Sequence, residues 1–140
     1  MTRILALDIG QKRIGIAVSD ALNITAQGIE TLKRQDIETV LKRIGSLVKE
    51  YDVSKIVVGI PFNMDGSKGR SAALVEEFIA ELKQGVSAEI ATVDERLTTL
   101  EGERMLLEAD VSRKKRKASI DKIAAQLILQ IYLDSKCIKK

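Results

Sequence analysis

The sequence contains no histidine among its 140 residues. The absence of histidine excludes a Ser-His-Asp triad, a histidine general base and any metal centre with imidazole ligands. Chemistry in this chain must therefore use carboxylates, lysine, arginine, hydroxyls, one thiol or a bound cation. Oxygen ligands favour a hard divalent ion such as Mg²⁺ or Mn²⁺.

Cysteine, long apolar runs and aromatic residues are also scarce. The single Cys137 excludes an internal disulfide and a cysteine-ligated zinc site, so we expect a reducing, cytoplasmic compartment. No apolar run reaches the roughly 18 residues that cross a bilayer, and the N-terminus lacks a signal-peptide layout, so no membrane partner is expected. Aromatic residues make up 3%, which argues against base stacking as a main mode of nucleic-acid recognition.

What the chain does contain is enough apolar material for a core. Hydrophobic residues make up 45% of the sequence, and the length suits one domain spanning residues 1–140. The charge is uneven, because residues 101–140 carry ten Lys or Arg and only six Asp or Glu. This basic part indicates either a polyanionic partner or a solvated surface, and charge alone leaves both interpretations open.

The hydrophobic pattern predicts a mixed sheet. Apolar runs predict strands at residues 3–9, 14–18, 22–32, 55–61 and 88–95, and helical periodicity predicts helices at 36–50, 71–83, 98–110 and from Ser119 onward. The basic stretch at 112–117 is expected to be a loop, Asp36 and Ser119 to be N-caps, and Ile37 and Leu74 to face the core. Three antiparallel strands followed by alternating helices and strands indicate an α/β fold with helices flanking the sheet.

Acidic residues stand where that sheet would place a site. Asp8 interrupts the first apolar strand, Asp94 and Glu95 close the last strand, and Asp121 lies early in the final helix. Ligand sites of open α/β sheets form beyond the carboxyl ends of the parallel strands. Carboxylates that meet there repel one another unless a cation lies between them, and two ions roughly 4 Å apart would suit phosphodiester hydrolysis.

The acids in the last strand and in the final helix also have a purely structural interpretation. Asp121 could favour the helix N-terminus through the macrodipole, and Asp94 to Arg96 could be a surface salt-bridge cluster. On strand alternation Asp94 and Glu95 lie on opposite faces, and periodicity alone does not tell which face meets Asp8. Asp8 is the hardest to explain structurally, because an unpaired buried charge is costly.

Four blocks in this order resemble a known family. The segments "DIGQKRIGIAVSD", "VVGIPFNMDGSKGRS", "DERLTTLEGERML" and "SIDKIAAQLILQIYL" are similar to those of the YqgF/RuvX family, which has an RNase H-like fold related to the RuvC Holliday junction resolvases. The resemblance implies a mixed five-stranded sheet. It also implies that Asp8, Glu95 and Asp121 are the catalytic and metal-binding acids, and we expect them to hold two Mg²⁺ or Mn²⁺ ions.

The resemblance further implies a hydrolase that cuts nucleic acid. Its expected role is maturation of the 5′ end of pre-16S rRNA in ribosome biogenesis, and the alternative is cleavage of four-way DNA junctions. Both reactions use the same acids, so the residues do not separate structured RNA from branched DNA as substrate. A monomer and a homodimer are both compatible with the sequence, since junction cleavage needs two active sites and end trimming needs one.

Two other classes compete with a nuclease. A phosphate-binding ATPase of the actin and Hsp70 type also begins with an Asp-x-Gly hairpin, but such enzymes close a cleft between two domains, and no second hairpin of this kind follows. A non-catalytic nucleic-acid binder would gain nothing from acids at its contact surface.

Basic residues in several segments are candidates for contacts with the nucleic-acid backbone. The resemblance singles out the cations of the first turn and of the Asp-Glu-Arg block, while the glycine-containing loop and the basic stretch stand out by their charge at a helix start. The alternative for the glycine-containing loop is an ordinary mobile loop, and the alternative for the basic stretch is a solvated loop. The candidates are Lys12, Arg13, Arg70, Arg96, Arg113, Lys114, Lys115, Arg116 and Lys117.

Overall fold

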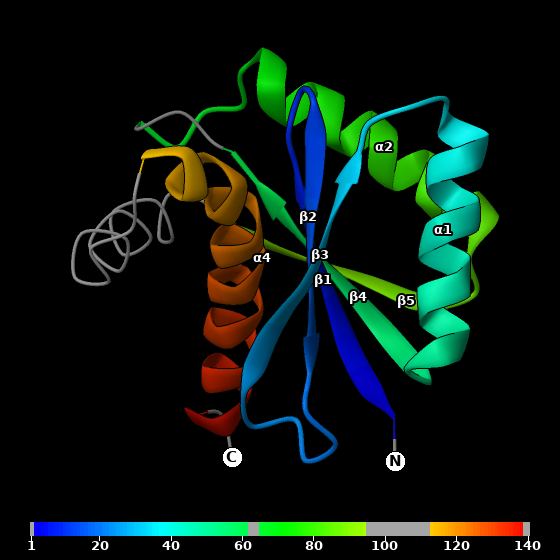
Figure 1. The fold of residues 1–140 in the computed structure, drawn as a ribbon, viewed down its shortest axis with the longest axis vertical. Helices are drawn as coiled ribbons and strands as arrows, with labels where there is room; N and C mark the ends of the chain where they lie inside the picture. Colours follow the sequence, from blue (N-terminus) through cyan, green and yellow to red (C-terminus); the bar gives the residue numbers. More distant parts are fainter. Residues whose placement is uncertain (1, 62–64, 95–112, 139–140) are drawn as a thin grey trace.

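The fold is a five-stranded mixed sheet with helices on both faces. A computed structural model describes residues 2–61, 65–94 and 113–138, with side chains left undescribed at 113–122 and 136–138. The strands are β1 (Arg3–Ile9), β2 (Arg13–Ser19), β3 (Ala26–Lys33), β4 (Val53–Ile60) and β5 (Glu89–Asp94). Their order across the sheet is β3-β2-β1-β4-β5, and Figure 1 shows the twist that they share.

Pairing directions follow from the connections. The short turns after β1 and β2 produce antiparallel pairs, whereas β4 and β5 arrive through helices and pair in parallel with β1 and with each other. The β2–β3 pair is irregular near Gly28, because its register shifts between Ile16, opposite Glu30, and Ala17, opposite Gly28.

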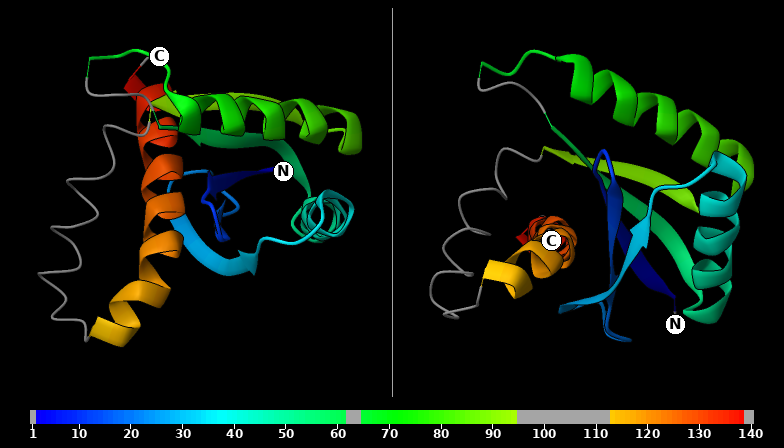
Figure 2. Two further views of the ribbon diagram at one scale, coloured as in Figure 1. Left: turned by 90° about the horizontal axis from the view of Figure 1, so that it is seen from above. Right: turned by 45° about the horizontal axis from the view of Figure 1, so that its top comes forward.

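The sheet separates two apolar clusters. Helices α1 (Ile37–Glu50) and α2 (Arg70–Gly85) cover one face, and α4 (Arg113–Ile138) crosses the other (Figure 2). Strand alternation assigns the residues, since Leu5 and Leu7 pack toward α1 and α2 while Ile4 and Ala6 pack toward α4. Both faces are buried, which explains why β1 reads as an almost continuous apolar run.

The tight turn between β1 and β2 confirms the predicted hairpin. The Gly10 amide donates to the Arg13 carbonyl oxygen at 2.9 Å. A Cβ atom at Gly10 would lie 2.7 Å from that same oxygen, so only glycine allows this close approach of the backbone.

Helices α1 and α2 confirm most of the prediction. Asp36 is the N-cap of α1, and its carboxylate accepts from the Thr39 amide at 3.1 Å. The expectation that Ile37 and Leu74 face the core was wrong, because their exposed fractions are 37% and 42%. Both line a pocket between the two helices, which leaves them partly exposed.

The start of the last helix was also predicted wrongly. Helix α4 includes Arg113 through Lys117, so these residues are not a loop and Ser119 is not an N-cap. Lysine, arginine and alanine have high helix propensity, and no glycine or proline breaks the run. Asp121 therefore lies beyond the first turn, which weakens its interpretation as a macrodipole partner.

Two further observations complete the comparison with the expected elements. The helix predicted at 98–110 lies outside the described residues. In the part of the chain that the structure describes, no helix is both long and apolar enough to cross a membrane.

Candidate active site

Asp8 lies at the carboxyl end of β1, the central strand of the sheet. It is half-buried, and its neighbour on β2 is Gly15, which carries no side chain that could fill the space beside the carboxylate. The other parallel strands, β4 and β5, end at this same edge, with Ile60 paired to Asp94. The edge of the sheet at which we expect the site is therefore the edge where the three parallel strands end.

The sheet register shows on which face of the sheet Asp94 lies. Asp8 follows Ala6 by two residues, and Ala6 packs toward α4, so Asp8 is on the α4 face. Asp94 pairs with Ile60, which belongs to the cluster beneath α1 and α2. Asp8 and Asp94 thus lie on opposite faces, a point that strand periodicity could not settle.

Helix α4 runs antiparallel to β1 and crosses the face that carries Asp8. Its later residues are attached near the amino end of β1. The Gln130 side chain accepts from the Ala26 amide at 3.1 Å, and the Lys55 ammonium donates to the Tyr132 hydroxyl at 2.8 Å. Earlier residues of α4 consequently lie toward the carboxyl end of β1 (Figure 1), and Asp121 is one of these.

The predicted trio of acids stays a prediction. Glu95 lies outside the described residues, and at Asp121 only the helical backbone is described. Among the residues that the structure describes, no three Asp, Glu or Cys side chains gather as a metal site. Asp8, the one member whose surroundings are described, lies at the expected edge of the sheet, on the face that α4 crosses.

The predicted cations fall in three places. Lys12 and Arg13 are exposed on the β1–β2 turn, directly after the strand that carries Asp8. Arg70 is the exposed first residue of α2, next to the N-cap Gly69. Residues 113–117 open α4, and Arg96 lies outside the described residues.

Arg34 is a basic residue that the sequence analysis missed. Its guanidinium Nη1 donates to the Gly10 carbonyl oxygen at 2.9 Å, and its backbone amide donates to the Lys12 carbonyl oxygen at 2.9 Å. The two segments are 24 residues apart along the chain, and no local pattern predicts such a contact. It becomes visible only once β3 is paired beside β2.

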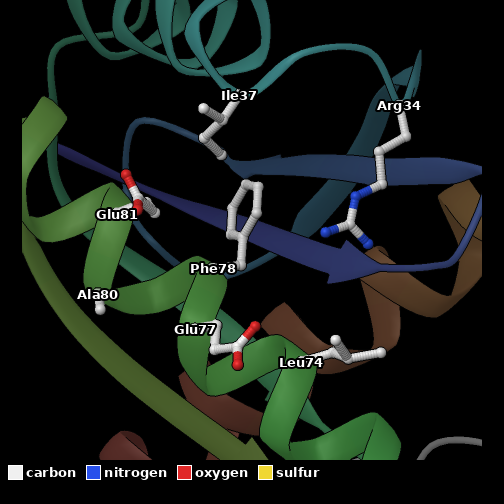
Figure 3. A pocket seen from close by; sticks show the side chains of 7 residues that line it. All are labelled: Arg34, Ile37, Leu74, Glu77, Phe78, Ala80 and Glu81. Atoms are coloured by element: carbon white, nitrogen blue, oxygen red, sulfur yellow. The ribbon is translucent and has the colours of Figure 1, made fainter.

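A pocket of about 410 Å³ lies elsewhere, between α1 and α2. Figure 3 shows Ile37, Leu74 and Phe78 around it, with Glu77 and Glu81 on α2 and Arg34 at its other side. Pockets are often the best guide to an active site. This one is on the face of the sheet opposite Asp8, so the strand ends are the better candidate.

Comparisons with known proteins agree on the family and the fold. A family model described as "RuvX: Holliday junction resolvase" matches residues 2–135. A protein of Halalkalibacterium halodurans named "Putative pre-16S rRNA nuclease" is 58% identical over 139 residues, covering 98% of this chain and 99% of the relative. A protein of the same name from Natranaerobius thermophilus is 54% identical, covering 94% of both chains.

Solved structures share the architecture at low sequence identity. The RuvC of T. thermophilus, solved with a Holliday junction substrate, superposes with a TM-score of 0.54 at 12% identity, covering 98% of this chain and 96% of that one. The large terminase nuclease of phage G20c superposes with a TM-score of 0.57 at 12% identity, covering 94% and 81%. At this identity the likeness shows the fold alone, which this chain shares with RuvC and with the terminase nuclease.

Proposed function

The chain belongs to the RuvX family, and from this premise we propose that it is a nuclease that hydrolyses phosphodiester bonds with the help of a divalent cation. Its substrate is the precursor of 16S rRNA, as the names of its relatives say of those proteins. The observation that carries the proposal is the position of Asp8, which is half-buried on the α4 face at the end of the central strand.

The register of β5 supports Glu95 as the second acid. Ala91 and Val93 pack toward α4, whereas Asp94 pairs with Ile60 on the other face. An acid that shares a site with Asp8 would lie on the α4 face, which favours Glu95, the next residue, over Asp94.

Helix spacing supports Asp121 as the third acid. Ala125 and Ile128 are fully buried against the sheet, and Asp121 precedes them by four and seven residues. Residues with this spacing share one face of a helix. On this spacing we expect Asp121 to continue the stripe of Ala125 and Ile128, at the end of the helix nearer to Asp8.

The chemistry of this donor set fits Mg²⁺ or Mn²⁺. The three candidates are carboxylates, and the chain contains no histidine to offer nitrogen. Such ions, when bound, would polarise the scissile phosphate, lower the pKa of an attacking water and stabilise the leaving oxygen. Asp8, Glu95 and Asp121 would hold them at the strand ends, while Lys12 and Arg13 on the adjoining turn bind phosphates beside the scissile bond.

Cleavage of four-way DNA junctions is the second candidate function. It is favoured by the description of the matching family model and uses the same acids. Purified protein with Mg²⁺ or Mn²⁺ should therefore be offered pre-16S rRNA and a four-way DNA junction side by side. Faster cleavage of the RNA is the expected result, and faster resolution of the junction would reverse the order of the two candidates.

Acid substitutions test the mechanism. Asp8→Asn and Glu95→Gln should each lower cleavage by at least about a thousandfold, the scale on which loss of a key catalytic group acts, whereas Asp94→Asn should retain most activity. Asp94→Asn is a matched control, because it changes the adjacent carboxylate on the opposite face. Normal turnover in Asp8→Asn would contradict the mechanism. If the wild-type protein binds nucleic acid but does not cleave it, a non-catalytic binding protein is favoured.

A further inference from the structure

Arg34 connects the turn after Asp8 to helix α2. It follows β3 directly, and its amide donates to the Lys12 carbonyl oxygen at 2.9 Å. Its guanidinium reaches further along the same turn and donates to the Gly10 carbonyl oxygen, also at 2.9 Å. One residue thus holds two carbonyl groups of the turn that presents Lys12 and Arg13.

A backbone hydrogen bond closes the turn. The Gly10 amide donates to the Arg13 carbonyl oxygen at 2.9 Å, and Gln11 and Lys12 between them are exposed. A hydrogen bond from a charged guanidinium is stronger than a neutral one. The contact from Arg34 to Gly10 therefore adds a charge-assisted hydrogen bond to those that hold the shape of this turn.

The guanidinium itself rests on a rigid support. Its Cζ atom lies 5.7 Å from the centre of the Phe78 ring, and Phe78 is 3% exposed within the core between the sheet and α2. Figure 3 shows the guanidinium directed toward this ring. A planar cation stacked on a buried ring is held in place better than a flexible ammonium would be.

We propose that Arg34 is a positioning residue for substrate binding. It fixes the Gly10–Arg13 turn so that Lys12 and Arg13 face the phosphates next to the bond that is cut. The inference rests on the proposed nuclease function, because it takes those two side chains as phosphate contacts. Arg34 acts through the turn and makes no contact with the nucleic acid itself.

Hydrogen exchange, measured without substrate, tests whether Arg34 fixes the turn. In Arg34→Ala, hydrogen exchange at the Gly10 amide should become about five- to tenfold faster, the effect of one lost hydrogen bond on a local opening. The Asn23 amide, which closes the β2–β3 turn on Asp20, is the internal reference and should not change. Arg34→Lys, which keeps a cationic donor, should show an intermediate rate.

Arg43→Ala is the control for general loss of stability. Arg43 is also an arginine, and it forms a two-pronged ion pair with Glu30 at 2.6 and 2.9 Å, which joins α1 to β3. Arg43→Ala should leave Gly10 exchange unchanged. Equal Gly10 exchange in wild type and Arg34→Ala would overturn the proposal.

A double-mutant cycle tests whether Arg34 acts on substrate binding through Lys12 and Arg13. Arg34→Ala should weaken binding of the nucleic acid that the protein cleaves by roughly tenfold in the wild-type background. In the Lys12→Ala/Arg13→Ala background it should weaken binding by less than about twofold, because the groups it positions are already gone. A full tenfold loss in both backgrounds would overturn positioning in favour of direct contact. Faster Gly10 exchange together with no nucleic-acid binding by the wild-type protein would instead overturn the proposed function.

Discussion

Two glycines of this fold, Gly10 and Gly45, differ in the space around them for a side chain. A methyl group at Gly10 would lie 2.7 Å from the Arg13 carbonyl oxygen, whereas at Gly45, inside α1, it would meet no atom within 4 Å. The first glycine is required by the turn beside Asp8. The second only lowers the helix propensity of α1.

We therefore expect Gly10→Ala and Gly45→Ala to change stability in opposite directions. Gly10→Ala should lower the free energy of unfolding by about 1–3 kcal/mol through overpacking, and Gly45→Ala should raise it by about 0.5–1 kcal/mol. Urea denaturation measures both. A neutral Gly10→Ala variant would mean that the turn can relax around the added methyl group.

Two aspartates outside the active site make stability depend on pH. Hydrogen bonds from the Ile24 and Thr25 amides hold the pKa of Asp20 below its ordinary 3.8. At Asp36 the hydroxyl and amide of Thr39 lower the pKa in the same way. A carboxyl whose pKa is lower in the folded state stabilises the fold above its unfolded pKa, and this contribution disappears as pH falls through the folded value.

The double variant Asp20→Asn/Asp36→Asn tests this dependence. Asparagine can accept the same amide hydrogen bonds but does not titrate. Between neutral pH and about pH 3, its free energy of unfolding should fall less steeply than that of the wild type. Urea denaturation at several pH values measures the slopes, and equal slopes would show that neither carboxyl contributes.

Among the elements, α4 shows where sequence patterns mislead. The run Arg113 to Lys117 resembles a solvated basic loop by charge, but its residues favour helix, and α4 includes them. The strands were easier to predict, because apolar runs bounded by Gly10, Pro61 and acidic ends leave little choice. Pairing partners such as Gln130 and Ala26, 104 residues apart, could not be predicted from either segment alone.

Replacing Lys114, Lys115 and Arg116 by alanine should separate binding from stability. Cations at a helix N-terminus oppose the macrodipole, so their removal should leave the free energy of unfolding unchanged or slightly higher. If they contact phosphates, nucleic-acid affinity should fall, and the slope of affinity against salt should decrease by about 0.7–0.9 per lost contact. Anisotropy titrations at several salt concentrations measure both quantities.

The control for this triple variant replaces three exposed lysines on the other face. Lys42, Lys49 and Lys83 lie on α1 and α2, and their replacement by alanine changes the net charge equally. That variant should keep the wild-type salt slope. The same slope in all three proteins would show that the basic start of α4 is only a solvated surface.

For the whole molecule, the layer arrangement was predictable and the site only partly so. Strand alternation and three antiparallel strands followed by helices led to the mixed sheet, since each face had to be covered. A reason to favour Glu95 over Asp94 needed the register of β5 against β4, because a shift by one residue exchanges the faces. The role of Arg34 needed the folded β2–β3 pair.

Cation binding should appear in global stability. If Asp8, Glu95 and Asp121 share a site, Mg²⁺ or Mn²⁺ at a hundredfold its Kd should stabilise the wild-type protein by about 2.7 kcal/mol, which raises Tm by several degrees. Asp8→Asn should respond much less. Without added cation this variant should be at least as stable as the wild type, because carboxylate repulsion is relieved.

Calorimetry with and without the cation measures these shifts. Ca²⁺ is a useful comparison, since it also prefers oxygen ligands but needs more of them at longer distance. An equal rise of Tm in wild type and Asp8→Asn would place the cation elsewhere on the molecule.

The position of α4 in the chain has a consequence for the timing of synthesis. This helix covers Ile4, Ala6, Ala17 and Ala26, yet the ribosome makes it after every strand. The face of the sheet that α4 covers therefore remains exposed while β4, α2 and β5 are synthesised. Asp121 is synthesised only as part of α4. A growing chain can therefore pair its strands early, and if Asp121 belongs to the proposed site, that site is complete only once α4 has emerged.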